Sequence, residues 1–263
     1  AREQIYQQLA DELGAAPIQH IGKLLVLWRP KDIVSGDLYL FHRDADGWLA
    51  GLVDCAGHGV TGALMTVLAH GAFQTAIDRV GSHDPAAILN VMNEIVRAPF
   101  AEQLASRQRV PTSMEAALVR IDPGQATLTY AGARIALYCV DRDGTVTVCK
   151  GGRRALGEKR QETYQSQTLP AQGLDCYLTS DGLLDQSGGP QEFGFGASRF
   201  AGLLGTLHTL PWADRLETLT SALTDWQGQE PQLDDICVIG FTAMPDPRKP
   251  AGDLACSSST TPA

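Results

Sequence analysis

The 263-residue sequence lacks the features that mark several large classes of protein. Its 21 lysine and arginine residues are outnumbered by 30 aspartate and glutamate residues, so the formal net charge is −9 and the basic footprint of a nucleic-acid-binding protein is absent. No apolar run reaches membrane-spanning length, and no signal peptide is present. The six cysteines show no CxxC spacing, so no zinc site is indicated and we expect buried thiols in a reducing compartment.

The remaining composition is that of an ordinary globular protein. Hydrophobic residues make up 44% of the chain, which is enough for one sizeable core. We expect a single folded domain over residues 21–243. An N-terminal helix should precede it within residues 1–20, and a disordered tail rich in Pro, Ser and Thr should follow it over residues 244–263.

The N-terminal helix carries a narrow apolar stripe. Ile5, Leu9 and Leu13 recur at four-residue steps, which is typical of a helix that packs on a partner helix or on its own domain. A docked helix and a dimerising or regulatory helix both fit this pattern. Because the chain begins with Ala1 rather than Met, we expect it to be a piece of a longer protein.

The order of the predicted elements favours an α+β fold. No regular alternation of strand and helix is present, and closely spaced strands with tight turns suggest antiparallel pairing, so we expect two antiparallel sheets flanked by helices. Residues 101–112 should form a loop or short helix. The expected strands are 24–28, 37–42, 48–54, 115–121, 126–131, 134–140, 145–149, 163–168, 174–179 and 235–242, and the expected helices are 60–79, 85–97, 197–206 and 212–226.

The stretch at 54–63, DCAGHGVTGA, stands where a buried strand ends and a helix begins. Gly57, Gly59 and Gly62 allow a tight turn and a close approach of the backbone to a small ligand. A carboxylate at a strand end, beside free helical N–H groups, suits a cation together with a phosphate. The alternative is a strand-to-helix turn in which Asp54 only caps the helix, and this stretch alone does not decide between them.

Further acidic residues occur in the same setting, at a strand end or strand start beside a small residue. They are Asp37, Asp181, Asp234 and Asp235. Each alone could be a turn-capping aspartate. Together with Asp54, and without a cluster of His or Cys, they favour a site for a hard cation such as Mg²⁺ or Mn²⁺.

Five motifs carry a resemblance to a known family. In order they are VSGDLY at 34–39, DCAGHGVTGA at 54–63, YAGA at 130–133, LTSDG at 178–182 and DDI at 234–236. This order and spacing resembles that of the SpoIIE/RsbU-type serine phosphatases, the bacterial branch of the metal-dependent PPM protein phosphatases. The resemblance covers residues 20–242. It implies an αββα sandwich with a centre for two Mn²⁺ or Mg²⁺ ions between the sheets.

The resemblance also implies the metal ligands. Asp54 would bridge both metals, and Asp181 and Asp234 would hold the first. The backbone carbonyl of Cys55 would contact the second metal, as would Asp37, directly or through water. Two divalent ions lower the pKa of a bridging water, so that hydroxide is available to attack phosphorus without a covalent phosphoenzyme.

Two acidic positions are less clear. Asp235 matches a family position that supports rather than ligates the metal. Glu115 falls where relatives usually carry Asp. Its longer side chain could still reach a metal, or it could weaken the site there.

The phosphate and the leaving group would have their own residues. The helix N-terminus near Gly57 and Gly59 would stabilise the phosphoryl oxygens. His58 could protonate the leaving group, or it could be structural. Lys31 could meet the phosphate, or it could be a solvated cation.

These observations predict a metal-dependent serine/threonine phosphatase. By resemblance, its substrate is a phosphorylated STAS-domain protein of a bacterial partner-switching pathway. The domain would be cytoplasmic and part of a longer membrane-anchored sensor, and the N-terminal helix would relay a signal, through a homodimer or otherwise. The alternatives are a catalytically weak or silent phosphatase-fold module that binds a signalling partner and, more distantly, a metal-dependent phosphodiesterase. Neither nucleic acid nor membrane contact is expected of this fragment.

Overall fold

The computed structural model of the chain describes residues 23–100, 113–160 and 162–244. The predicted N-terminal helix, the predicted loop or short helix at 101–112, and the predicted tail beyond Met244 lie outside these residues.

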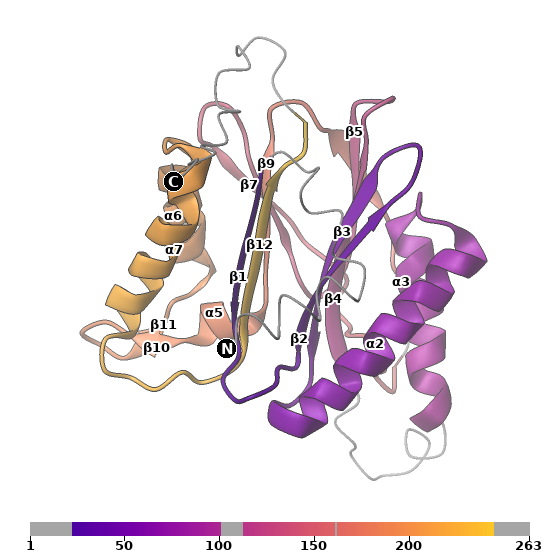
Figure 1. Cartoon of the computed structure of the whole chain (residues 1–263), viewed down its shortest axis with the longest axis horizontal. Helices are drawn as coiled ribbons and strands as arrows, with labels where there is room; N and C mark the ends of the chain where they lie inside the picture. The colour runs from indigo at the N-terminus through magenta and orange to yellow at the C-terminus, as the bar shows by residue number, and fades with distance from the viewer. Residues whose placement is uncertain (1–22, 101–112, 161, 245–263) are drawn as a thin grey trace, which may run out of the picture.

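The described residues form four layers, with a helix pair on each side of two stacked sheets (Figure 1). Helices α2 (Gly59–Val80) and α3 (Pro85–Arg97) cover one sheet, and α6 (Ala197–His208) and α7 (Trp212–Gln227) cover the other. Three buried clusters fill the spaces between the layers, one under each helix pair and one between the sheets. This arrangement confirms the predicted α+β sandwich.

Both sheets have five strands, and every pairing within them is antiparallel. The first runs, in spatial order, β2 (Asp37–Arg43), β3 (Trp48–Cys55), β4 (Met114–Asp122), β5 (Thr127–Ala133) and β8 (Gln167–Pro170). The second runs β1 (Leu24–Arg29), β12 (Ile236–Thr242), β9 (Asp175–Thr179), β6 (Leu137–Val140) and β7 (Val146–Cys149). The short elements are the 3₁₀ turn η3 (Ala98–Phe100), helix α5 (Asp181–Asp185) and the paired strands β10 (Ser187–Gly188) and β11 (Phe193–Gly194).

Two predicted strands were misplaced. The strand expected at 163–168 lies at Gln167–Pro170, and the strand expected at 134–140 begins only at Leu137. Arg134 accounts for the second error, because its backbone has φ of 72° and ends β5 in a turn. Helix α5 was not predicted, since five residues are too few to show a helical period.

Strand alternation decides which side chains face the space between the sheets. In β3, Leu49 and Val53 pack under α2 and α3, whereas Ala50 and Leu52 pack against the opposite sheet. Successive side chains on a strand point to opposite faces, so Asp54 shares the inner face with Ala50 and Leu52. The end of β3 therefore directs a carboxylate into the mouth of the sandwich.

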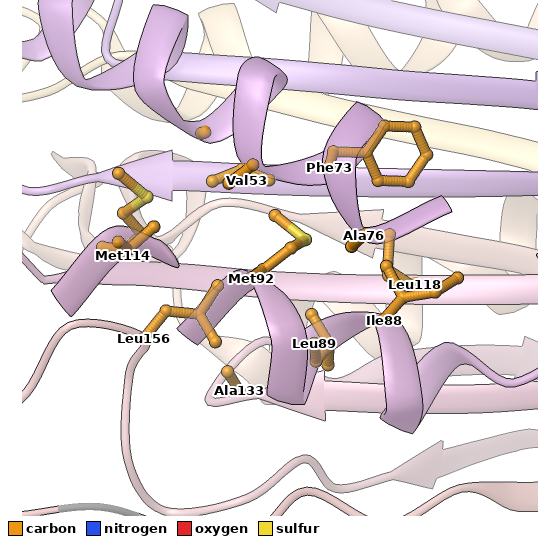
Figure 2. Packing of buried hydrophobic residues seen from close by; sticks show 14 of the residues in the cluster. Val53, Phe73, Ala76, Ile88, Leu89, Met92, Met114, Leu118, Ala133 and Leu156 are labelled. Atoms are coloured by element: carbon orange, nitrogen blue, oxygen red, sulfur yellow. The ribbon is translucent and has the colours of Figure 1, made fainter. Parts of the chain in front are cut away.

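The cluster under α2 and α3 fixes the position of both helices (Figure 2). Phe73 of α2 and Met92 of α3 meet Val53 and Leu118 of the sheet, with Leu156 from the β7–β8 connection at the margin. All five side chains are fully buried. Burial of such a side chain stabilises the fold by roughly 1.5–3 kcal/mol. These contacts hold α2 against the sheet.

Helix α2 is also apolar on its outer face. Val60, Leu64 and Val67 are 73%, 67% and 71% exposed. By length and composition alone the helix would suit a membrane span, contrary to the expectation that no run in the sequence is long and apolar enough. Its other face, with Ala69 and Phe73, is wholly buried on the sheet, so α2 is packed here as a core helix of the domain.

The first turn of α2 lies too close to its surroundings to accept a side chain at Gly62. A Cβ there would press on the carbonyl oxygen of Gly57 and stand 2.9 Å from the Cα of Gly36. We expect Gly62→Ala to lower the free energy of unfolding by about 1–3 kcal/mol, since α2 or the adjoining loop must shift. Denaturant titration measures this change.

Gly71→Ala is the matched control, because the same substitution in the same helix meets open space. Replacing an exposed helical glycine by alanine should stabilise the protein by about 0.5–1 kcal/mol. Equal effects of the two substitutions would contradict the close packing at Gly62.

Candidate metal centre

Three carboxylates stand side by side where the first sheet ends. Asp54 of β3 is in register with Asp37 of β2 on one side and with Glu115 of β4 on the other. Alternation puts all three on the inner face, since Tyr39 and Ala117, two residues away along their strands, belong to the cluster between the sheets. Laterally paired residues lie about 4.5–5.5 Å apart, so the three acidic groups form one row.

The second sheet brings further acidic groups to the same mouth. Asp181 begins α5 directly after β9, and its backbone N–H lies 3.4 Å from Oδ2 of Asp54. Asp234 and Asp235 precede β12, the strand next to β9. Helix α5 and the first turn of α2 lie at the same end of the sandwich, the lower end in Figure 1. We call the six residues the carboxylate cluster: Asp37, Asp54, Glu115, Asp181, Asp234 and Asp235.

Asp235 is engaged with the backbone between β1 and β2. Its Oδ1 accepts the N–H of Lys31 and its Oδ2 accepts the N–H of Gly36, each at 2.7 Å, and the residue is only 3% exposed. Asp234 in turn accepts the N–H of Asp235 at 2.8 Å through Oδ1. Both carboxylate oxygens of Asp235 therefore hold the loop that leads into Asp37.

Ser180 ties the two sheets together, and the sequence prediction missed it. Its hydroxyl donates to Oδ2 of Asp37 at 2.6 Å and accepts the N–H of Cys237 at 2.9 Å, and the residue is fully buried. The available signal was its place in the LTSDG motif, one residue before Asp181. An inward-facing serine between a buried strand and an acidic turn is a candidate partner for a carboxylate.

Arg134 is the second residue that the prediction missed. Its Nη1 donates to Glu115 at 3.0 Å and its Nη2 donates to Glu158 at 2.7 Å. The hydrogen bond to Glu115 raises the pKa of Arg134 further above its ordinary value. The backbone of Arg134 is in the left-handed region, with φ of 72°, which side chains other than glycine rarely adopt.

Burial and mutual repulsion raise the pKa values of the carboxyl groups at the centre of the cluster. Burial, together with the charges of the neighbouring Asp37 and Asp181, raises the pKa of Asp54 to about 10. Burial also raises the pKa of Asp37 to about 8, against the hydrogen bond from Ser180 that lowers it, and burial raises the pKa of Asp181. The protein supplies too little positive charge for these groups, and their oxygen atoms are the ligands that Mg²⁺ and Mn²⁺ prefer.

The side chains are not gathered as a finished ligand set. In the described ranges no group of three or more His, Cys, Asp or Glu side chains is arranged to hold a metal ion as it stands. Existing bonds account for this, because Asp37 is bound to Ser180, Asp235 to backbone amides and Glu115 to Arg134. The donor chemistry nevertheless fits divalent cations, and Asp54 and Asp181 engage each other rather than a basic or hydroxyl side chain.

The residues predicted to meet the phosphate border this mouth. Gly57 and Gly59 adopt positive φ of 91° and 67° in the turn before α2. His58 is the N-cap of α2, and its Nδ1 lies 2.7 Å from Oδ2 of Asp32. The turn therefore presents the amides of the helix N-terminus and an oriented imidazole at the same place.

The structure gives the side-chain positions of Cys55 and Lys31, which the sequence left open. The Cys55 side chain is buried under α2, on the face of the sheet away from the carboxylates, so only its backbone can serve the site. The ammonium group of Lys31 donates to the carbonyl of Leu233 at 2.7 Å. Lys31 thus helps to hold the segment that carries Asp234.

A separate hollow of 720 Å³ lies at the opposite end of β2 and β3, around the turn between them. Trp48, His83 and Asp122 are among its lining residues. The six residue steps along β2 from Asp37 to Arg43 put it about 20 Å from the carboxylate cluster, so it is no part of this site.

Comparison with known proteins agrees with this geometry. The family model described as "Stage II sporulation protein E (SpoIIE)" matches residues 44–243. The SiaA-PP2C domain of Pseudomonas aeruginosa is 39% identical, with a TM-score of 0.78 over 90% of this chain and 98% of that one. A comparison with curated proteins finds no match.

More distant solved structures share the fold. The RsbU and RsbW domains of Rv1364c from Mycobacterium tuberculosis align with a TM-score of 0.65 at 19% identity, over 83% of this chain and 59% of that one. The catalytic domain of the phosphatase PstP, solved with two manganese ions, aligns with a TM-score of 0.56 at 17% identity, over 83% and 96%. The fold and the matches define a PP2C-type protein serine/threonine phosphatase domain. Within that class, the chain belongs to the SpoIIE family.

The raised pKa values predict how stability depends on pH without a bound cation. A carboxyl whose pKa is raised by folding binds a proton more tightly in the folded state, so its contribution is lost as pH rises through the folded pKa. With Asp37 at about 8 and Asp54 at about 10, the metal-free protein should lose unfolding free energy as pH rises from 5 to 8, by about 1.4 kcal/mol per pH unit for each group that stays protonated in the folded state.

Urea titration of chelator-treated protein at several pH values measures this loss. Asp54→Asn cannot ionise and should flatten the pH dependence, and saturating Mn²⁺ should flatten it in the wild type. A stability that stays constant or rises over this range would contradict the assignment.

Substitution of Ser180 should weaken both metal binding and stability. Ser180→Ala removes the hydroxyl that holds Asp37 and leaves the N–H of Cys237 without its partner. We expect affinity for Mn²⁺ to fall about 10–100-fold and stability to fall by about 1–3 kcal/mol. Calorimetric titration with Mn²⁺ measures the affinity. Ser221→Ala, at an exposed position on α7, is the control and should change neither quantity.

Proposed function

We propose that this domain hydrolyses phosphoserine and phosphothreonine esters on a partner protein, with two Mn²⁺ or Mg²⁺ ions held by the carboxylate cluster. The observation that carries the proposal is the row Asp37–Asp54–Glu115 facing Asp181 across the sandwich, with the pKa values of Asp37, Asp54 and Asp181 raised by burial. The two manganese ions of PstP support the stoichiometry.

We propose the ligand roles that the family resemblance implies. Asp54, at the centre of the row, would contact both ions. Asp181 and Asp234 would hold one, and Asp37 and the carbonyl of Cys55 would hold the other. When bound, the ions would activate water for attack on phosphorus and offset the charge of the phosphoryl group. Asp235 would support the site through the backbone that it binds, and Glu115 would enter only after releasing Arg134.

The chain's own residues orient the ester and move a proton. The amides of Gly57 and Gly59, at the N-terminal turn of α2, suit the phosphoryl oxygens. The imidazole of His58, held through Nδ1 by Asp32, leaves Nε2 to protonate the departing serine or threonine oxygen. Lys31 would add positive charge at the rim of the site.

The family supports a proposal for the partner. Similarity to SiaA, and to an RsbU domain found with an RsbW domain, supports a regulatory phosphoprotein as the substrate, and we propose a phosphorylated STAS-domain protein. The five described cysteines are free, in keeping with the cytoplasm. Membrane anchoring through a longer sensor, and relay or homodimer formation through residues 1–20, stay predictions.

One observation favours the silent-module alternative. The Glu115 carboxylate is occupied by Arg134, so one acidic group is withdrawn from the cluster. The remaining acidic positions are all retained, and this favours catalysis.

Phosphate release tests the proposal directly. The wild type should release phosphate from a generic phosphomonoester and from a phosphoserine STAS protein with Mn²⁺ or Mg²⁺, and not with chelator. Asp54→Ala should reduce the rate at least about 10³-fold, because the central ligand is lost. Asp225→Ala, at an exposed position on α7, should leave the rate unchanged.

No release by folded protein with either metal would favour the silent module. Activity on nucleotides alone would favour a phosphodiesterase. Equal loss in the two variants would remove the special role of Asp54.

A further inference from the structure

Positive charge is concentrated in one short segment of this acidic chain. Five of the 21 basic residues lie within residues 150–160, which contain a single acidic residue, Glu158. They are Lys150, Arg153, Arg154, Lys159 and Arg160. We call residues 150–160 the basic segment. The rest of the chain is acidic, so this concentration of positive charge is unusual for the protein.

The basic segment runs beside the carboxylate cluster. Leu156 pairs with Met114, the first residue of β4, through two backbone hydrogen bonds of 2.9 and 2.8 Å. The carbonyl of Gly152 accepts the N–H of Arg134 at 2.9 Å. Glu115 follows Met114 directly, so the segment passes along the edge of the site.

Only part of this charge is neutralised. The Glu158 carboxylate binds Arg134 at 2.7 Å and Arg154 at 3.1 Å. Arg153, Lys159 and Arg160 are exposed and form no ion pair within the described ranges. Lys150 is likewise exposed and forms no ion pair within these ranges, so four unneutralised cations stand on the segment that adjoins Glu115.

This separation of charge matters for an anionic substrate. A phosphoprotein that approaches the mouth meets the field of the carboxylates, which divalent ions offset only at the centre. Exposed cations on the rim attract acidic groups over about one Debye length, roughly 8–10 Å at physiological salt. When the phosphate enters the centre, the residues that flank it would pass beside Glu115, where the basic segment is attached.

We propose that the basic segment binds acidic residues flanking the phosphorylated serine or threonine of the protein substrate. This inference rests on the proposed phosphatase function and adds a substrate class to it. Arg153, Lys159 and Arg160 provide the contacts, and Arg134 and Glu158 hold the segment beside the site. The patch is small and adjoins the catalytic mouth, which favours a substrate's flank over an extended nucleic acid or membrane surface.

A pair of phosphoserine peptides tests the proposal. In one, the three residues after the phosphoserine are Glu, and in the other they are Gln. With the wild type and Mn²⁺ at low salt, kcat/KM should be at least about 10-fold higher for the Glu peptide. The preference should fade at 0.5 M salt, and the triple variant R153Q/K159Q/R160Q should bring the two peptides within about twofold. Hydrolysis of a small phosphomonoester should not change in that variant.

The triple variant K23Q/R43Q/R79Q is the matched control, since it removes the same charge from exposed positions away from the site. Lys23 and Arg43 lie at the far ends of β1 and β2, and Arg79 lies at the far end of α2. It should keep the peptide preference. Preference that survives in the first variant, or that is lost equally in both, would overturn the proposal.

Binding separates this inference from the phosphatase assignment. The fluorescence anisotropy of a labelled Glu phosphopeptide should report binding that R153Q/K159Q/R160Q weakens about 10-fold, even if the wild type releases no phosphate from any ester. Binding to phosphatidylserine vesicles that depends on the basic segment, without any peptide preference, would overturn the proposal in favour of a membrane surface.

Discussion

Burial of carboxylates between two sheets constrains the rest of this structure. Asp37 and Asp235 are each 3% exposed, and an unsatisfied charge at that depth would cost several kcal/mol. The protein satisfies them with the Ser180 hydroxyl and with the amides of Lys31 and Gly36. These hydrogen bonds join one sheet to the elements of the other, so the bonds that make burial tolerable also fix the spacing of the sheets at the site.

Asp54 differs from these supporting carboxylates in its hydrogen-bond partners. Within the described residues its polar contacts with the second sheet are all with Asp181, whose amide lies 3.4 Å from Oδ2, and its neighbours in the row are themselves acidic. The group with the most strongly raised pKa is therefore the least satisfied and the most central. Rigid carboxylates form a frame, and the unsatisfied one within it gains most from a cation.

Local patterns in the sequence predicted the layers and the acidic positions well. Strand alternation and strand ends are properties of neighbouring residues, so Asp37, Asp54 and Asp181 could be singled out. The partners of these residues are not local, since Ser180 meets Asp37 across 143 positions and Arg134 meets Glu115 through an unusual backbone conformation. The strand expected at 163–168 lies at Gln167–Pro170 because its pairing with residues 127–130 of β5, which are distant in the sequence, sets its bounds.

One chain of contacts joins the centre of the site to its rim. Glu158 binds Arg134 and Arg154, Arg134 binds Glu115, and Glu115 stands in register with Asp54. The basic segment is therefore attached to the residue that occupies Glu115, and release of Glu115 toward a cation would also free part of the Arg134 guanidinium. Short-range hydrogen bonds set this geometry and resist salt, whereas the exposed cations act at longer range and are screened by it. Catalysis and substrate selection thus depend on interactions that differ in their sensitivity to ionic strength, although three arginine–glutamate contacts connect them.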